Sequence, residues 1–209
     1  MLPEKLALAQ AVCTRLCHDL GGAVGALAAA IELMESESRG PRDADDAAGV
    51  AHDAVRVIDR RLRFLRAAIG GCGDCGRDEI AQLAEGLTLG RRATVDTGGL
   101  APGLQLHPAA AQSLLLATWV GMEALPRGGV VRLAGEGAER LTVWPDGPGA
   151  AWPAGLAAAL AGDPPAPSPR GIAPVLLALV AAAGRVRLDL LFGPSGGAAP
   201  LMLVATPTA

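Results

Sequence analysis

The sequence predicts an α+β fold in which an N-terminal hairpin of two long helices is followed by helices packed on one side of a mixed sheet. Two observations predict it. Up to residue 71, apolar residues recur at spacings of three and four, which is the period of an amphipathic helix. After residue 77 the pattern changes to short alternating helix and strand segments separated by Gly and Pro. We therefore expect two domains, over residues 1–71 and 77–209.

Two helices account for the first domain. The first is predicted over residues 3–37, and the second follows a turn over residues 38–46, in which Asp43 or Asp45 is expected to be the N-cap. The second helix ends after Ile69, where a glycine-rich loop begins. The apolar stripe of the first helix consists of Cys13, Leu16, Leu20, Val24, Leu27, Ile31 and Met34; that of the second consists of Val50, Ala54, Val57, Ile58, Leu62, Leu65 and Ile69, with Arg56, Arg60 and Arg63 on its other side.

A single hairpin has too little internal contact to bury two wide apolar stripes. A second copy of the same hairpin would bury them in a four-helix bundle around a two-fold axis, so we expect a homodimer. The alternative is that the C-terminal half of the same chain covers the stripes.

The second domain is predicted to alternate between helices and strands. Helices are expected over residues 78–89, 108–125 and 172–183, and strands over residues 93–97, 130–133, 141–144, 185–192 and 201–206. The stretch over residues 145–171, between the strand at 141–144 and the helix at 172–183, is rich in Gly and Pro and is expected to be irregular.

The composition excludes several functions. With 51% hydrophobic and 19% charged residues the chain can bury a substantial core. A 2% aromatic content and a net charge of −3 disfavour nucleic-acid binding, which uses stacking platforms and clustered positive charge. No unbroken apolar run reaches the roughly 18 residues of a membrane span. We therefore expect a cytoplasmic protein whose partners are proteins, with no nucleic acid and no membrane.

Four cysteines raise the question of a metal site. Cys72 and Cys75 form a Cys-x-x-Cys pair, which is half of a zinc site. Cys13 and Cys17 lie one helical turn apart and would complete it only if the fold brought the two pairs together. We expect an ordinary loop and no metal.

His18 is the residue most suited to chemistry. At about 100° per residue, the apolar stripe of the first helix averages near 200° on the helical wheel and His18 lies near 0°, so its side chain is predicted to face solvent. On the same side lie Ala11, Thr14, Arg15, Gly22, Gly25 and Ala29. Each glycine in a helix interior costs about 1 kcal/mol relative to alanine, so a protein that docks flush against this surface would explain Gly21, Gly22 and Gly25.

A neutral imidazole is a nitrogen nucleophile near neutral pH, and Asp19 can orient or polarise it. These properties suit phosphoryl transfer, which depends mainly on positioning and charge neutralisation. From helix geometry alone, a surface histidine with no role remains the alternative. His52 and His107 have no comparable setting and are expected to be structural.

The residues from Arg15 to Leu27, RLCHDLGGAVGAL, resemble the phosphoacceptor box of histidine kinases and, more closely, that of the ChpT-type histidine phosphotransferases of alphaproteobacteria. Three further segments continue the resemblance. Residues 114–129 are similar to the helix and turn of the kinase asparagine box, residues 146–149 to the first glycine box, and the segment from residue 170 onward to the second.

The chain departs from the kinase pattern in its nucleotide boxes. It contains no asparagine, so the asparagine box cannot chelate the magnesium of a nucleotide in the usual way, and the glycine boxes lack the paired Gly-x-Gly. The resemblance therefore implies a degenerate α/β sandwich domain of the histidine-kinase type that does not bind ATP. Gly22 stands where many kinases place an Asn or Thr that assists dephosphorylation, which favours a reversible relay.

The resemblance also implies roles and partners. His18 would accept the phosphoryl group and Asp19 would orient it. From their place beside His18 on the helical wheel, Arg15, Gly22 and Gly25 are expected to contact the partner. The donor would be the receiver domain of a hybrid histidine kinase, and the acceptors would be receiver domains of response regulators. The chain would have no cofactor of its own, with Mg²⁺ supplied by the receiver. A catalytically silent dimeric adaptor and an ATP-dependent kinase core are the alternatives.

Overall fold

The N-terminal hairpin is formed by α1 (Leu2–Glu35) and α2 (Pro41–Gly70). This computed structural model describes residues 2–35, 41–192 and 197–205, so the predicted end of the first helix at Glu37 lies outside it. α2 already begins at Pro41, and the turn predicted over residues 38–46 is therefore too long, with Asp43 and Asp45 inside the helix rather than at its cap. The early start has a physical reason, because proline is well suited to the first position of a helix.

The remaining elements form an α/β part around a five-stranded sheet with strand order β2-β4-β5-β7-β6. β2 is parallel to β4 and the other neighbours are antiparallel, which confirms the predicted mixed sheet. The elements are α3 (Arg77–Thr88), β2 (Ala93–Leu100), α4 (Pro108–Glu123), β4 (Gly129–Gly137), β5 (Arg140–Asp146), α6 (Ile172–Ala183), β6 (Val186–Leu190) and β7 (Leu201–Ala205).

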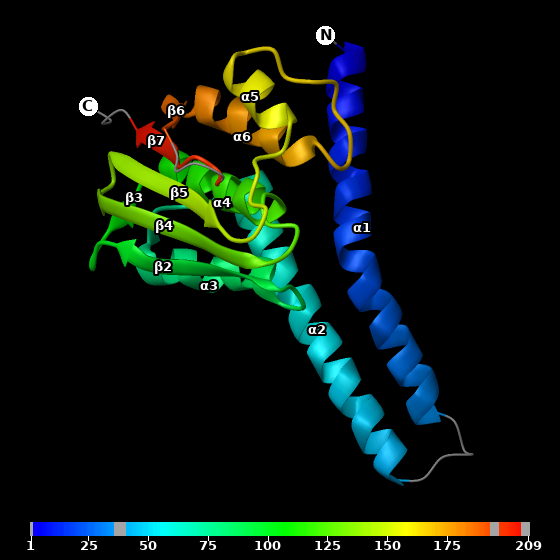
Figure 1. Cartoon of the computed structure of the whole chain (residues 1–209). Coiled ribbons are helices and arrows are strands. Elements are labelled where there is room, and N and C mark those ends of the chain that lie inside the picture. The colour runs from blue at the N-terminus through cyan, green and yellow to red at the C-terminus, as the bar shows by residue number, and fades with distance from the viewer. Residues whose placement is uncertain (1, 36–40, 193–196, 206–209) are drawn as a thin grey trace.

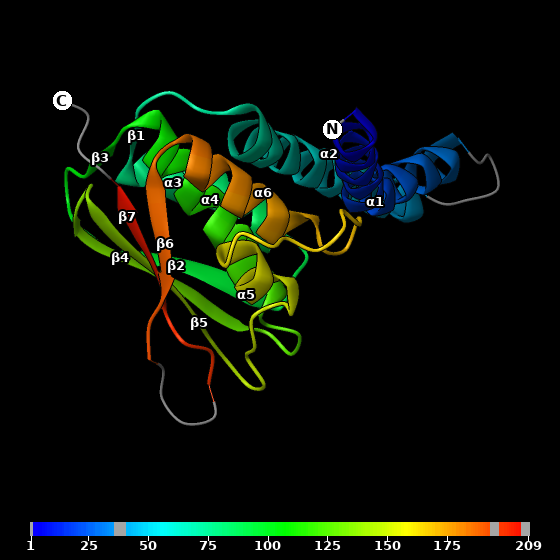
Figure 2. The ribbon, with the colours of Figure 1, turned by 90° about the horizontal axis from the view of Figure 1, so that it is seen from above.

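Helices cover one side of this sheet and separate it from the hairpin (Figure 2). The central helix, α4, is buried on nearly all sides because it lies between the sheet and α2. This position explains the almost continuous apolar sequence of α4, from Leu114 to Met122, in which a one-sided stripe is absent.

Three short elements were not predicted. α5 (Gly155–Leu160) lies in the stretch expected to be irregular, and β1 (Cys75–Gly76) pairs with β3 (Gln105–Leu106) as a two-stranded ladder. A helix of six residues and strands of two residues are too short to produce a recognisable period in the sequence.

Close packing ties the hairpin to the α/β part. Phe64 of α2 meets Trp119 of α4 edge to face, with the ring centroids 6.1 Å apart. A side chain on Gly86 of α3 would collide with the backbone of Arg60, so α3 approaches α2 too closely for any other residue. The buried residues of α2 and of the α/β part form one continuous cluster. The predicted boundary falls between the end of α2 at Gly70 and the start of α3 at Arg77, and the buried cluster continues across it.

The far end of the hairpin projects beyond the α/β part (Figure 1). In the first half of α1, Leu8, Val12 and Leu16 pack against the core. Of the predicted α1 stripe, Leu16, Leu20 and Leu27 are half-buried, whereas Cys13 is exposed. Farther along, large apolar side chains are exposed, and Val24 reaches 51%. The exposed set consists of Val24, Ile31 and Met34 in α1 and Val50, Val55 and Leu62 in α2.

α1 is long and apolar enough to cross a membrane when judged by length and composition, with a mean hydropathy of 1.3 in its 18-residue window. α1 nevertheless contains no unbroken apolar run of that length, because charged residues interrupt the helix. Core helices of soluble proteins and signal sequences meet the same criterion. α1 packs along α2 and carries the paired Arg15 and Asp19.

Candidate functional site

His18 lies midway along α1 with its side chain 83% exposed, which confirms the predicted orientation. Its Nδ1 is 3.4 Å from Oδ1 of Asp19, near the outer limit for a hydrogen bond. An N–H at Nδ1 would donate to this carboxylate, which leaves Nε2 as the nitrogen with an open lone pair. The Asp19 side chain itself is only 11% exposed, so the carboxylate is largely buried while the imidazole is not.

Arg15 joins three elements at this point. One turn before Asp19, its Nε donates to Oδ2 of that carboxylate at 2.8 Å, and its Nη2 lies 2.7 Å from Oε1 of Glu123 on α4. Nη1 donates to the carbonyl oxygen of Pro169 at 3.3 Å, and the guanidinium carbon lies 5.1 Å from the centroid of the Trp119 ring. The Arg15 side chain is only 11% exposed, so its charge is directed into this chain.

Burial and neighbouring charges have opposite effects on the pKa values of Arg15 and Glu123. Burial tends to lower the pKa of Arg15, but the neighbouring Glu123 and Asp19 outweigh it and raise the pKa above its usual value. Burial raises the pKa of Glu123, and the Arg15 charge only partly compensates. Arg15 therefore stays protonated and positively charged, whereas the carboxyl group of Glu123 is desolvated by its surroundings.

Arg61 of α2 fixes the backbone of the same turn. Its Nη1 donates to the carbonyl oxygen of Asp19 at 2.5 Å, and its Nη2 donates to the carbonyl oxygen of Leu89 at 3.4 Å. Burial, reinforced by repulsion from Arg91, lowers the pKa of Arg61. The turn that carries His18 is thus held from α2 through Arg61 and from α4 through the Arg15 side chain.

A groove of about 520 Å³ opens beside His18, between α1 and the α/β part. Two segments that resemble kinase nucleotide boxes contribute to it: α4 supplies Glu123, and the segment before α6 supplies Pro169 and Arg170. The lining residues are Thr14, Arg15, His18, Asp19, Arg91, Glu123, Pro153, Pro169 and Arg170. The lining contains three arginines and two carboxylates, so its formal charge is positive.

The predicted surface of small residues around His18 is only partly exposed. Thr14, Gly22, Gly25 and Ala29 face solvent, but Ala11 is buried and Arg15 is covered, because the α/β part packs on that side of α1. A Cβ built on Gly21, Gly22 or Gly25 would meet nothing within 4 Å. Packing within the described chain therefore does not require glycine at these three positions.

The four cysteines do not come together. Cys13 and Cys17 are exposed on α1, whereas Cys75 is buried in β1 and Cys72 is half-buried. Burial raises the pKa of the Cys75 thiol to about 12 and also raises that of Cys72, so both are thiols at neutral pH. Among the described residues no three His, Cys, Asp or Glu side chains are grouped to hold a metal ion.

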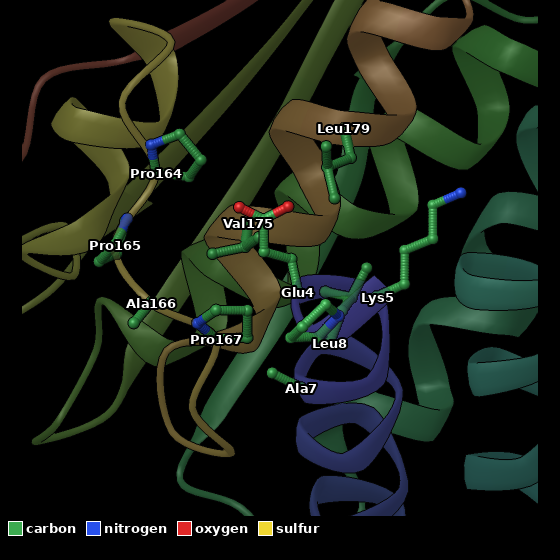
Figure 3. A pocket seen from close by; sticks show the side chains of 11 residues that line it. Glu4, Lys5, Ala7, Leu8, Pro164, Pro165, Ala166, Pro167, Val175 and Leu179 are labelled. Atoms are coloured by element: carbon green, nitrogen blue, oxygen red, sulfur yellow. The ribbon is translucent and has the colours of Figure 1, made fainter. Parts of the chain in front are cut away.

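A second groove lies near the N-terminal end of α1, between that helix, α6 and residues 164–167 (Figure 3). Its volume is about 670 Å³, and its lining is mainly apolar, with Leu8, Val175 and Leu179 beside four prolines. Glu4 and Lys5 are its charged lining residues, and its lining pairs no nucleophile with a base. Of the two grooves, the one at His18 is therefore the candidate for a chemical reaction.

Sequence reasoning did not identify Arg61, Arg91, Glu123 and Arg170 as part of the site. They come from four separate segments, and each approaches His18 or Asp19 only through the tertiary fold. Two arginines on the basic side of α2 form ion pairs away from His18: Arg63 pairs with Asp59 at 2.9 Å, and Arg60 pairs with Glu85 at 3.4 Å. His52 is exposed and His107 is half-buried before α4.

The α/β part corresponds to a known family: a model of the C-terminal domain of histidine phosphotransferases matches residues 77–191. The chain belongs to the histidine phosphotransferase family. Residues of the chain also align with the protein phosphotransferase ChpT of Brucella abortus (strain 2308), with 37% identity over 71 residues. This alignment covers 34% of the chain and 32% of the relative. The expected resemblance to ChpT-type histidine phosphotransferases is therefore confirmed.

The fold of this phosphotransferase family member is also that of a solved structure, a bacterial phosphotransferase. The two superimpose with a TM-score of 0.75 over 95% of this chain and 96% of the other, at 23% sequence identity. The shared architecture thus extends over the hairpin as well as the α/β part.

Proposed function

We propose that this chain is a phosphorelay intermediate. His18 accepts a phosphoryl group from the receiver domain of a hybrid histidine kinase and passes it to the receiver domains of response regulators, in the cytoplasm. The observation that carries the proposal is the exposed His18 imidazole, which faces the held Asp19 carboxylate in the middle of an open helix surface. Membership of the histidine phosphotransferase family supports it.

The transfer step that we propose uses Nε2 of His18 as the nucleophile. Nε2 attacks the phosphorus of an acyl phosphate on the receiver, and an N–P bond forms while the P–O bond to the receiver's carboxylate breaks. The carboxylate leaves with the electron pair. The proton stays on Nδ1, where Asp19 at 3.4 Å stabilises the positive charge that the ring acquires. The same step in reverse hands the group to the next receiver.

The charge of the transferring group must be neutralised. We propose that Mg²⁺ for this purpose belongs to the acidic pocket of the receiver, and that the chain contributes no cofactor of its own. Arg91 and Arg170 line the groove beside His18 and would attract that acidic surface, which raises the association rate at low salt.

We also propose that the α/β part does not bind ATP. The sequence contains no asparagine for the magnesium of a nucleotide. Arg15 reaches Glu123, which lies in a segment that resembles the asparagine box, and Pro169, which directly precedes the segment that resembles the second glycine box. These contacts suit a recognition surface better than a kinase core.

A transfer assay tests the proposal. A receiver domain carrying a radiolabelled phosphoryl group is mixed with the full chain and Mg²⁺, without ATP, and we expect the label to move to the chain. In a parallel arm, labelled ATP without a receiver is expected to give no labelled chain. Label that stays on all receivers tried would favour the silent adaptor, and labelling from ATP would establish a kinase core.

Gly22→Ala should separate stability from function. Alanine in place of an exposed helical glycine should raise the free energy of unfolding by about 1 kcal/mol, because nothing lies within 4 Å of the added Cβ. The methyl group would stand one turn from His18 on the proposed docking surface, so we expect transfer to slow by about tenfold.

The control for this pair of measurements is Gly49→Ala on α2, where the added Cβ also meets nothing within 4 Å. It should bring a similar gain in stability and leave the transfer rate unchanged. A Gly22→Ala protein that transfers at the wild-type rate would contradict a receiver docked against this part of α1.

We propose that the exposed apolar side chains of the hairpin form a homodimer as a four-helix bundle. Ile31→Asp places a charge in that surface, so sedimentation should change from a dimer to a monomer while the helical circular dichroism is kept. Leu179→Asp, at an equally exposed leucine of α6, is the control and should remain dimeric. A wild-type monomer at micromolar concentration would refute the bundle.

A further inference from the structure

We infer that Arg15 is a positioning residue for the transfer: it holds the Asp19 carboxylate against His18 Nδ1 and anchors that turn of α1 to α4. This inference rests on the proposed function and deepens it. It also gives Arg15 a role different from partner contact, which was the expectation from its place on the helical wheel beside His18.

The first support is the way in which the Asp19 carboxylate is shared. Arg15 Nε binds Oδ2 at 2.8 Å, and His18 Nδ1 faces Oδ1 at 3.4 Å. The planar guanidinium sets the direction of the carboxylate plane, which in turn sets the tautomer and orientation of the imidazole. Without Arg15, the carboxylate could rotate away from the ring.

The second support is that Arg15 is itself fixed. All three of its guanidinium nitrogens have partners within the chain, on α1, on α4 and on the segment before α6. The guanidinium also lies over the face of the buried Trp119, where a cation is attracted to the ring. With 11% of the side chain exposed, little of Arg15 remains for a receiver to touch.

A consequence is that the α/β part helps to orient His18 although it does not contact the imidazole by any described hydrogen bond. Glu123, at the last position of α4, is the anchor. The degenerate domain would then contribute to the reaction through the geometry of Arg15, in addition to any binding of the receiver.

A double-mutant cycle tests this role. The maximal transfer rate and the receiver concentration at half-saturation are measured for wild type, Arg15→Lys, Asp19→Asn and the double variant. If Arg15 acts through Asp19, Arg15→Lys should lower the maximal rate on the order of tenfold to a hundredfold, with half-saturation unchanged within twofold. In the Asp19→Asn background it should add little further loss.

Arg63→Lys is the matched control, because Arg63 also pairs with an acidic residue four positions away on its helix, but in an exposed place. It should change neither parameter. An Arg15→Lys protein with raised half-saturation and an unchanged maximal rate would instead make Arg15 a partner contact. Independent, multiplicative losses in the cycle would also overturn the inference.

A spectroscopic measurement keeps the inference testable without any receiver. Nitrogen NMR of the His18 ring should show the Nδ1–H tautomer predominating in wild type, and a larger share of the Nε2–H tautomer in Arg15→Lys. If Arg15→Lys does not fold, Arg15→Gln serves as the second variant. Equal tautomer populations in wild type and a folded variant would refute positioning by Arg15, whereas a His18→Gln protein that still accepts the label would refute the proposed function.

Discussion

His18→Gln is expected to abolish acceptance of the phosphoryl group, with a loss on the order of a thousandfold or more, because the amide side chain has no nucleophilic ring nitrogen. Stability should hardly change. The His18 side chain is 83% exposed, and surface substitutions usually alter the free energy of unfolding by about 0.5 kcal/mol or less. The measurement is transfer from a labelled receiver, with circular dichroism and sedimentation on the same samples.

The control is His52→Gln, at an exposed histidine of α2 that lacks a described contact with the site. This protein should accept the label at the wild-type rate. A His18→Gln protein that is folded and still takes up the label would exclude His18 as the acceptor and leave the adaptor hypothesis.

Trp119→Ala is expected to have the largest effect on stability. Trp119 is fully buried, packs edge to face on Phe64 of α2 and lies under the Arg15 guanidinium. Replacing a buried Trp or Phe by Ala costs about 3–5 kcal/mol through lost packing and the cavity that remains. For a chain of this size the melting temperature should fall by about 10 °C or more.

Trp144→Ala provides the comparison, because Trp144 is half-exposed on β5 and faces away from the helices. We expect it to cost about 1 kcal/mol. Urea unfolding of the three proteins at one protein concentration checks both values, since dimerisation would make stability depend on concentration. Equal losses for the two variants would contradict the central place of Trp119 between the hairpin and the α/β part.

Much of the architecture could be predicted because periodicity is a local signal. The spacing of Leu16, Leu20 and Leu27 gave the first helix, and α6 was predicted with the bounds that it has in the structure. The exposure of His18 also followed from the helical wheel alone. These features depend on the chain within one element and need no knowledge of its neighbours.

The position of Arg15 could not be predicted in this way. The wheel placed Arg15 beside His18 on a solvent-facing surface, but the α/β part packs against Arg15. The partners that cover it are distant in sequence, since Pro169 is 154 positions from Arg15. No residue near Arg15 signals those contacts, and the same is true of Arg61, which reaches Asp19 from α2.

The hairpin surface shows where sequence and structure complement each other. The sequence indicated that two apolar stripes need cover and left two ways to provide it. In the structure, the same chain covers only part of the apolar surface. The α/β part covers α1 around Leu8, Val12 and Leu16, whereas Val24 and Ile31 remain exposed. The exposed remainder is the surface on which the proposed dimer rests.

The most direct test of the account is to locate the phosphoryl group on the wild-type chain after incubation with a phosphorylated receiver and no ATP. Mass spectrometry of peptides kept at alkaline pH, where phosphohistidine is stable, should place the group on His18. Phosphorus NMR should assign it to Nε2, because Nδ1 faces Asp19 at 3.4 Å. A phosphoryl group on another residue, or a chain that carries none while the receiver keeps its label, would contradict the His18 relay.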